Sequence, residues 1–333
     1  MKKTNAFFVL MIMVSIMIFI SGCNDKAKSG TVSSEQVELY SYIPDSATGL
    51  FTINFNKLTA VPAFNEIKED MKFDKIGKEQ KFFKGYADFV EKTGIDPKKD
   101  VKSVVVAIFG EIGEKEPDVS VIANLNYDKQ KLLALLKESK TDFQATDFNG
   151  MTLYSGKDEK GKEGGFIFLS DNLITAGTIN GVKKIASLAG TNGKNILSDP
   201  KMSSYMSKAG NSSIFSFAFR FPEKMKGIKG NSMVKADFSK AEAFYGNVDF
   251  SSNIWAGKFV LVSLNEEGNT NLVTTLNGLK GLGAMGGPEI AELINNINIT
   301  ASPDSIILSF KISSELLEKL KTKAEEKAGS FNK

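Results

Sequence analysis

The chain has 333 residues, of which 42% are hydrophobic and 24% are charged, and its formal net charge is +3 at pH 7. This composition is typical of a globular protein, and the near-neutral charge gives no support for nucleic acid binding. The chain contains no histidine, which excludes Ser-His-Asp and Cys-His catalysis and imidazole-ligated zinc or haem. Arginine occurs only at Arg220, so bidentate recognition of phosphate or carboxylate is not expected to dominate.

The first residues have the features of an export signal. Lys2 and Lys3 give the start of the chain a positive charge, and residues 6–20 form an apolar run. This run is shorter than the roughly 20 residues that a permanent membrane-spanning helix requires. We therefore predict that residues 1–22 are a signal peptide.

The apolar run ends in Ile20-Ser21-Gly22-Cys23, which resembles the bacterial lipobox, an aliphatic residue and two small residues before a cysteine. Leucine is usual in the first place, and isoleucine is a tolerated departure. The resemblance implies that Ile20, Ser21 and Gly22 are recognised by the lipoprotein signal peptidase, and that lipid such as palmitate is attached at Cys23. Several acyl chains on one residue anchor durably, since each buried methylene contributes roughly 0.8 kcal/mol. An ordinary cleaved signal and an uncleaved anchor helix are the alternatives.

The resemblance implies a membrane-anchored protein whose domain lies outside the cytoplasm, in the periplasm or at the cell surface. Asn24, rather than aspartate, follows the cysteine, which favours the outer over the inner membrane. Cys23 is the only cysteine, so the fold has no internal disulfide and depends on its core. Residues 23–38 are polar and predict a lipidated tether, with the fold beginning near Leu39.

Beyond the tether, hydrophobic spacing predicts an α+β fold of antiparallel sheets with packed helices. Strands are predicted at residues 49–55, 101–109, 118–125, 151–154, 166–169, 173–178, 213–221, 241–250, 258–264 and 306–312. Helices are predicted at residues 64–71, 82–90, 127–136, 182–188 and 316–320, and after Asp199-Pro200 and Gly287-Pro288, the latter reaching Ile297. Residues 272–279 fit a helix at least as well as a strand.

The domain organisation is predicted from composition and from short sequence motifs that occur twice in the chain. Residues 222–239 read as a long connection, which divides a first α+β subdomain, 39–221, from a second, 222–333. Pro44-Asp45-Ser46 recurs as Pro303-Asp304-Ser305, and Leu125-Asn126 before a Leu-rich helix recurs as Leu264-Asn265. Two related halves and chance both explain these matches.

Two further stretches resemble a layout of uncharacterised exported bacterial lipoproteins. In that layout an Ile-Pro-x-x-Ala opening, here residues 43–47, precedes a strand. A Gly-x-Asp-Pro stretch, here Gly94-Ile95-Asp96-Pro97, precedes another. The resemblance carries no catalytic residues, and it implies only an exported globular domain.

Three motifs suggest chemistry, and each has a simpler interpretation. Residues 281–286 have the spacing of a dinucleotide-binding loop, but a helix–helix connection fits better. Residues 147–150 resemble a calcium loop, yet Asn149-Gly150 is typical of a hairpin turn. Asp96 and Asp100 form a carboxylate pair in a solvated loop. We therefore predict no catalytic residue, no cofactor and no metal site.

The aromatic residues offer one further candidate. The chain has 25 phenylalanines against seven tyrosines, and Phe215, Phe217, Phe219 and Phe221 recur every second residue. Such side chains share one face of a strand, and they belong either to the core or to a cavity for an apolar ligand. Trp255, at a predicted hairpin turn, is either a contact residue or a cap on the sheet.

The sequence leaves three hypotheses about function. The first is a non-enzymatic, membrane-tethered module of the envelope that binds a protein partner or has a structural role. The second is a carrier or sensor of a hydrophobic ligand such as lipid. The third is an envelope hydrolase that works without histidine. Nucleic acid is not expected as a partner.

Overall fold

The computed structural model describes residues 34–65, 86–110, 117–138, 143–157, 163–191, 193–210, 212–226 and 238–330. The predicted signal peptide with Ile20, Ser21, Gly22 and Cys23 lies outside these ranges, as do most of the two helices predicted between residues 64 and 90. The fold begins earlier than predicted, because helix α2 (Ser34–Ser41) includes residues assigned to the tether. The fully buried Leu39 attaches this helix to the sheet.

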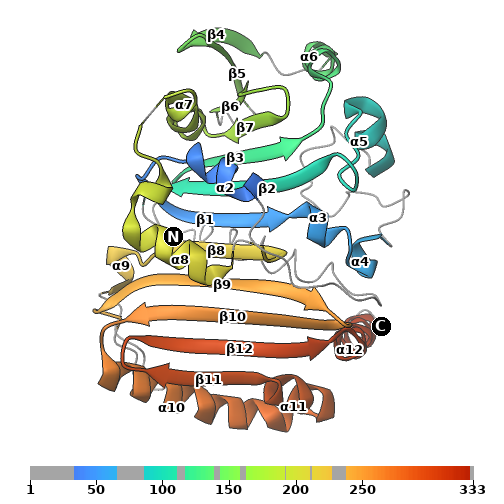
Figure 1. Cartoon of the computed structure of the whole chain (residues 1–333). Coiled ribbons are helices and arrows are strands. Elements are labelled where there is room, and N and C mark those ends of the chain that lie inside the picture. The colour runs from blue at the N-terminus through green and yellow to red at the C-terminus, as the bar shows by residue number, and fades with distance from the viewer. Residues whose placement is uncertain are drawn as a thin grey trace.

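The strands of the described residues form one antiparallel sheet of 12 strands, in the order β11-β12-β10-β9-β8-β1-β2-β3-β7-β6-β5-β4 (Figure 1). This confirms the predicted α+β class. The strands are β1 (Ala47–Asn54), β2 (Val101–Phe109), β3 (Asp118–Leu125), β4 (Gln144–Phe148), β5 (Met151–Lys157), β6 (Glu163–Phe168), β7 (Leu173–Gly177), β8 (Phe215–Arg220), β9 (Ala241–Ser251), β10 (Ile254–Ser263), β11 (Ile297–Ser302) and β12 (Ser305–Ser313). The predicted subdomains 39–221 and 222–333 meet within this sheet, where β8 pairs with β9.

Two strands were not predicted from the sequence. Ile297 continues the helical spacing of Ile290 and Leu293, so the predicted helix extended to it. Helix α11 (Pro288–Asn295) ends before this residue, and Ile297 opens β11. Strand β4 has a polar sequence at the end of the sheet, with four exposed residues, and its pattern does not alternate.

The order of the strands repeats across the sheet. From the centre, β1-β2-β3-β7-β6 run one way and β8-β9-β10-β12-β11 run the other, with β5 and β4 added beyond β6. Helix α2 precedes β1, and α8 (Pro200–Ala209) precedes β8. Of the two repeated motifs, Leu125-Asn126 lies at the end of β3 and Leu264-Asn265 directly follows β10, which is the equivalent strand. The Pro-Asp-Ser motif precedes β1 and β12, which are not equivalent. The repeated order supports two related halves.

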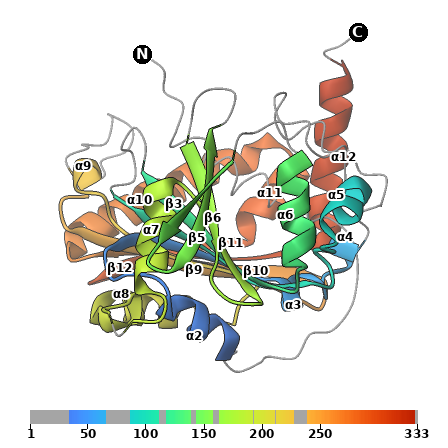
Figure 2. The same cartoon turned by 90° about the horizontal axis from the view of Figure 1, so that it is seen from above.

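Helices lie on both sides of the sheet (Figure 2). We call the side on which α2, α7 (Ile179–Leu188) and α8 pack the closed face, and the other side the open face. On the open face, α10 (Glu266–Gly283) packs on β11 and β12, with α11 and α12 (Ser314–Ser330) beside it. The remaining helices of the described residues are α3 (Phe55–Leu58), α4 (Pro62–Asn65), α5 (Tyr86–Thr93), α6 (Lys129–Glu138) and α9 (Glu223–Lys226), with 3-10 turns η1 (Ile196–Ser198) and η2 (Ala284–Gly286).

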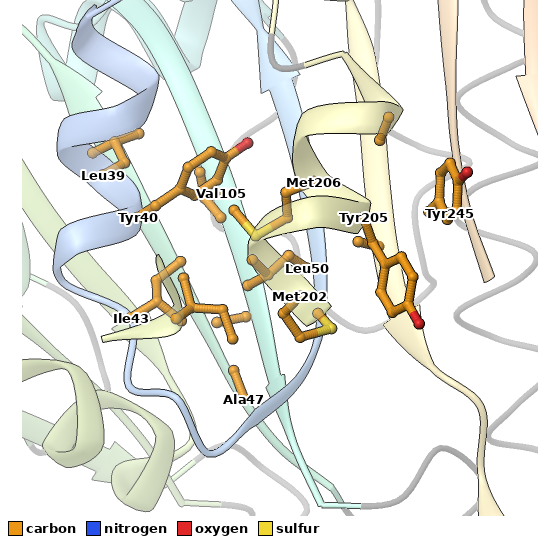
Figure 3. Close-up of a cluster of buried hydrophobic side chains, with 14 of the residues drawn as sticks. Leu39, Tyr40, Ile43, Ala47, Leu50, Val105, Met202, Tyr205, Met206 and Tyr245 are labelled. Atoms are coloured by element: carbon orange, nitrogen blue, oxygen red, sulfur yellow. The ribbon is translucent and has the colours of Figure 1, made fainter. Parts of the chain in front are cut away.

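The largest core cluster lies between the closed face and helices α2 and α8 (Figure 3). Tyr40 of α2 is 2% exposed, and its hydroxyl lies 3.0 Å from Oγ1 of Thr52 in β1. Burial raises the pKa of this Tyr40 phenol. From α8, Met202 is fully buried and the Tyr205 ring stacks on Tyr245 of β9 at 5.6 Å. Helix α2 therefore packs on strands β1–β3, and α8 packs on β8 and β9.

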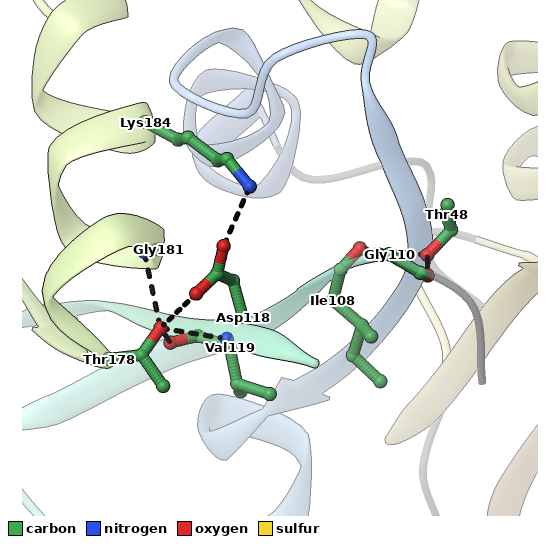
Figure 4. A network of polar contacts seen from close by, with 8 residues as sticks. All are labelled: Thr48, Ile108, Gly110, Asp118, Val119, Thr178, Gly181 and Lys184. Carbon is green, nitrogen blue, oxygen red and sulfur yellow. Dashed lines mark hydrogen bonds and ion pairs between the residues drawn. The ribbon is translucent and has the colours of Figure 1, made fainter. Parts of the chain in front are cut away.

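Helix α7 is fixed to β3 by a polar network around Thr178 (Figure 4). Thr178 Oγ1 accepts hydrogen bonds from the amides of Gly181 and Val119, both at 3.2 Å, so it caps the helix and holds the strand. Lys184, on the same helix, pairs with Oδ2 of Asp118 at 2.9 Å. This places the apolar residues of α7 on the closed face.

The two ends of the sheet differ. The carbonyl oxygens of Ile297 and Ile299 in β11 accept hydrogen bonds from Lys280 Nζ and from Asn277 Nδ2 of α10, the latter at 3.4 Å. These donors occupy outward-facing acceptors of that edge. At the other end, β4 pairs with β5 alone within the part of the chain that the structure describes.

Because the two faces differ in burial, we expect a valine-to-alanine substitution in β2 to cost more stability on the closed face than on the open face. We expect Val105→Ala, at a fully buried position of the closed face, to lower the free energy of unfolding by about 2 kcal/mol, through lost burial and a residual cavity. The adjacent Val106→Ala, on the half-buried open face, should lower it by less than about 1 kcal/mol. Urea unfolding followed by circular dichroism measures both, and equal losses would contradict the assignment of the faces.

Candidate functional site: the apolar open face

Burial alternates along the central strands, but hydrophobicity does not. In β2, Val105 and Ala107 are buried, whereas Val104 and Val106 are half-buried, and β3 shows the same alternation around the fully buried Ile122. An antiparallel sheet with one solvated face usually carries polar residues at its half-exposed positions. Here those positions are apolar, which marks the open face as a candidate binding surface.

The registers of the strands align these positions into one row across the sheet. Each strand from β11 to β4 contributes one residue, and every side chain in the row is apolar or aromatic, apart from one glycine. The row is Ile299, Leu308, Phe259, Gly246, Phe217, Phe51, Val106, Val121, Ala176, Phe166, Tyr154 and Ala145.

Packing covers part of this face. At the β11 end, Leu272 and Val273 of α10 pack with Ile306 and Leu261. Where β1 and β8–β10 end near α3, a second cluster with Leu58 and Val61 covers the face. Between these clusters the apolar side chains stay partly exposed, and Phe244, beside the row, is 37% exposed.

Phenylalanine rings form the floor of this exposed part. The Phe217 ring lies 5.0 Å from the Phe244 ring and 5.5 Å from the Phe259 ring, measured between centroids. These rings lie close to the backbone because glycines provide the space. A Cβ atom at Gly246 would meet the Lys258 carbonyl oxygen and would lie 2.6 Å from Cδ1 of Phe259. Gly49 and Gly257 make similar room for Phe219 and Phe310.

A second aromatic group lies on the same face toward β4. The rings of Tyr154 and Phe166 stack at 5.0 Å, and Phe168 meets Phe166 edge-on at 5.5 Å. Lys129 Nζ lies 5.1 Å from the centroid of the Phe168 ring. A cation over an aromatic ring at the border of an apolar surface provides attraction for an anionic group next to an apolar one.

The structure settles where the predicted aromatic residues lie. Phe215, Phe217 and Phe219 share the open face, as predicted, with Phe217 the most exposed of the three. Phe221 lies beyond the end of β8 and stacks on Phe238 instead. Trp255 is 6% exposed and packs on Phe250, so it belongs to the core rather than to an exposed contact.

The other candidate motifs have structural roles. Residues 281–283 lie in α10 and residues 284–286 in η2, so the glycine motif does not follow a strand. Asn149 and Gly150 adopt φ values of 54° and 76°, which confirms the predicted hairpin turn between β4 and β5. Among the described residues, no group of acidic or cysteine side chains is arranged to hold a metal ion. The same part of the chain contains no helix that is both long and apolar enough to span a membrane.

The predicted carboxylate pair, Asp96 and Asp100, shapes the loop before β2. Burial alone would raise the pKa of the Asp96 carboxyl, but hydrogen bonds from Tyr86, the Lys98 amide and Lys99 hold it below its ordinary value. Oδ2 of Asp100 accepts the Asp96 amide at 2.7 Å. The carboxylates are thus engaged in loop contacts.

The sequence predicted most strands of the sheet, but only for the phenylalanines of β8 did it predict a shared apolar face. The run at residues 101–109 predicted a strand buried on both sides, because β-branched residues at successive positions give no sign of which side is covered. Only the cross-strand registers show that Val106 continues the row of Phe51 and Phe217.

No protein-family model and no curated protein matches the sequence. Among solved structures, crystal form III of TP0453 is similar with a TM-score of 0.48 and 12% identity, covering 84% of this chain and 95% of that chain. Crystal form I of TP0453 gives a TM-score of 0.45 and 11% identity over 90% of this chain and 99% of that chain. Similarity at this level carries no information about activity.

The floor of the open face predicts the outcome of two glycine substitutions. We expect Gly246→Ala to lower the free energy of unfolding by about 1–3 kcal/mol, because a Cβ atom has no room between the Lys258 carbonyl and the phenylalanine rings. Gly278→Ala, in helix α10 with open space around it, should raise the free energy of unfolding by up to about 1 kcal/mol. Thermal and urea unfolding measure both, and a neutral Gly246→Ala would contradict the packing of the rings.

Proposed function

We propose that the chain is a non-enzymatic lipoprotein of the cell envelope, anchored through Cys23, whose open face binds an apolar ligand such as the acyl chains of a lipid. The observation that carries the proposal is the continuous apolar row, which α10 covers at its β11 end and which stays partly exposed from Phe259 to Tyr154. The lipobox resemblance supports the anchor. The absence of histidine from the sequence supports a binding role over catalysis.

The dimensions of the face suit a long ligand. The partly exposed positions run from Phe259 in β10 to Tyr154 in β5, across nine neighbouring strands. With about 4.8 Å between strands, this distance is roughly 38 Å. One leaflet of a bilayer has a hydrocarbon thickness of roughly 15 Å, so the row accommodates an extended acyl chain along its length.

The chemistry of the face also suits a chain-like ligand. Aromatic rings form flat contacts with methylene groups, and each methylene removed from water contributes about 0.8 kcal/mol. Lys129, near the β4 end, provides a cation for an anionic headgroup beside the apolar surface. A protein partner with an apolar face is the alternative that the experiment below separates from a lipid.

Native mass spectrometry of the protein, gently extracted from a bacterial envelope fraction, tests this function. We expect a co-purifying mass in the range of membrane lipids. A bare protein mass, together with no uptake of added fatty acid, would overturn the proposal. Cross-linking in cells that captured one protein through the open face, without lipid, would support the protein-partner alternative instead.

Two substitutions form a matched test of the location. Phe244→Asp places a charge on the open face, at a side chain that is 37% exposed. Ile254→Asp places the same charge at a position that is 39% exposed on the opposite side of β10 from Trp255. In titrations with a fluorescent fatty acid, we expect at least tenfold weaker binding for Phe244→Asp and unchanged binding for Ile254→Asp. Equal affinities would place the ligand elsewhere.

A further inference from the structure

A separate pocket of about 260 Å³ lies beside the start of α8, between the end of β8 and α9. Six charged side chains line it: Asp199, Lys201, Arg220, Glu223, Lys226 and Glu242. Arg220 is the single arginine of the chain. None of these residues belongs to the apolar row, so the pocket is independent of the proposed function.

Arg220 is held in place, yet several of its donors are unused. Oδ1 of Asp199 caps α8 by accepting the amides of Lys201 and Met202 at 2.8 and 3.0 Å. Oδ2 of Asp199 accepts a hydrogen bond from Arg220 Nη2 at 2.6 Å, and the Asp45 carbonyl oxygen accepts one from the same nitrogen at 2.9 Å. Within the described residues, Nη1 and Nε have no protein acceptor. The pocket therefore contains an immobilised guanidinium with free N–H groups, which is suited to an oxyanion.

Glu242 presents the complementary group. Its Oε2 accepts hydrogen bonds from Lys201 Nζ at 3.0 Å and from the Tyr205 hydroxyl at 3.3 Å. The hydrogen bond from Lys201 holds the pKa of the Glu242 carboxyl below its ordinary value, so it is ionised at neutral pH. Oε1 has no donor in the part of the chain that is described. This oxygen is suited to an ammonium group.

The charge balance narrows the class of ligand. Three carboxylates and three cations line the pocket, so its formal charge is zero and neither anions nor cations are attracted by a net field. A ligand that carries one negative and one positive charge pairs with both the remaining N–H groups of Arg220 and Oε1 of Glu242. Met202 and Phe221 provide apolar surface beside them. We propose that the pocket binds a small zwitterion with a carboxylate and an ammonium group, such as a free α-amino acid, with the carboxylate on Arg220 and the ammonium on Glu242.

Three probes test the need for both charges. Isothermal titration calorimetry of the protein purified after signal-peptide cleavage should show binding of L-leucine at neutral pH. L-Leucinamide lacks the carboxylate and 4-methylpentanoate lacks the amine, so each should bind at least tenfold more weakly. Absence of leucine binding, or equal binding of all three probes, would overturn the proposal.

Substitutions then test the two residues. Arg220→Lys keeps the positive charge but removes the planar fork, and Glu242→Gln removes the negative charge while keeping an amide oxygen. Lys208→Gln, at an exposed position of α8 outside the pocket, is the matched control. We expect leucine to raise the unfolding midpoint of the wild type and of Lys208→Gln, and to leave the other two unchanged. If Arg220→Lys fails to fold, Glu242→Gln decides, and an undiminished leucine shift in that folded variant would overturn the proposal.

Discussion

The structure depends on a sheet that has apolar side chains on both of its faces. On the closed face, helices α2, α7 and α8 remove these side chains from water, and Val105 and Ile122 are fully buried there. On the open face, α10 covers the β11 end of the row, and the cluster near α3 packs beside Phe51 and Phe259 where β1 and β8–β10 end. Burial of apolar surface stabilises by roughly 25 cal/mol per Å², so a half-exposed face forgoes stability that another covering helix would provide. Retention of such a face is what a binding surface requires.

The repeated strand order explains why the centre of the sheet is the part that is exposed. In each half, the helical connection leaves the third strand and returns to the outer hairpin, so α10 packs on β11 and β12 rather than on the middle strands. The strands that begin each half, β1 and β8, pair at the centre through Phe51 and Phe217. Their aromatic side chains point to the open face from both halves. The same junction brings α8 beside the end of β8, and this places Arg220 against Asp199.

The sequence predicted the class of fold and most strands, because period-two alternation and turn residues are local signals. Asn149-Gly150 and Asp199-Pro200 were interpreted correctly for that reason. The sequence could not predict the open face, since Val104 and Val105 have the same chemistry and only the sheet decides which one a helix covers. The pocket was missed as well. Glu242 and Lys201 are 41 positions apart, and the packing of α8 on β9 brings them together. Ile297 shows the opposite error, in which a local signal for a helix was followed too far.

The difference between the two ends of the sheet has a consequence for assembly. A fibril built by strand addition needs two receptive edges on every molecule, one to join the chain before it and one to join the chain after it. Lys280 and Asn277 already occupy two outward carbonyl oxygens of β11, which makes β4 the more receptive edge among the described strands. Two copies that met through β4 would consume the receptive edge of both. Edge-to-edge association of this protein would therefore favour a pair over a fibril.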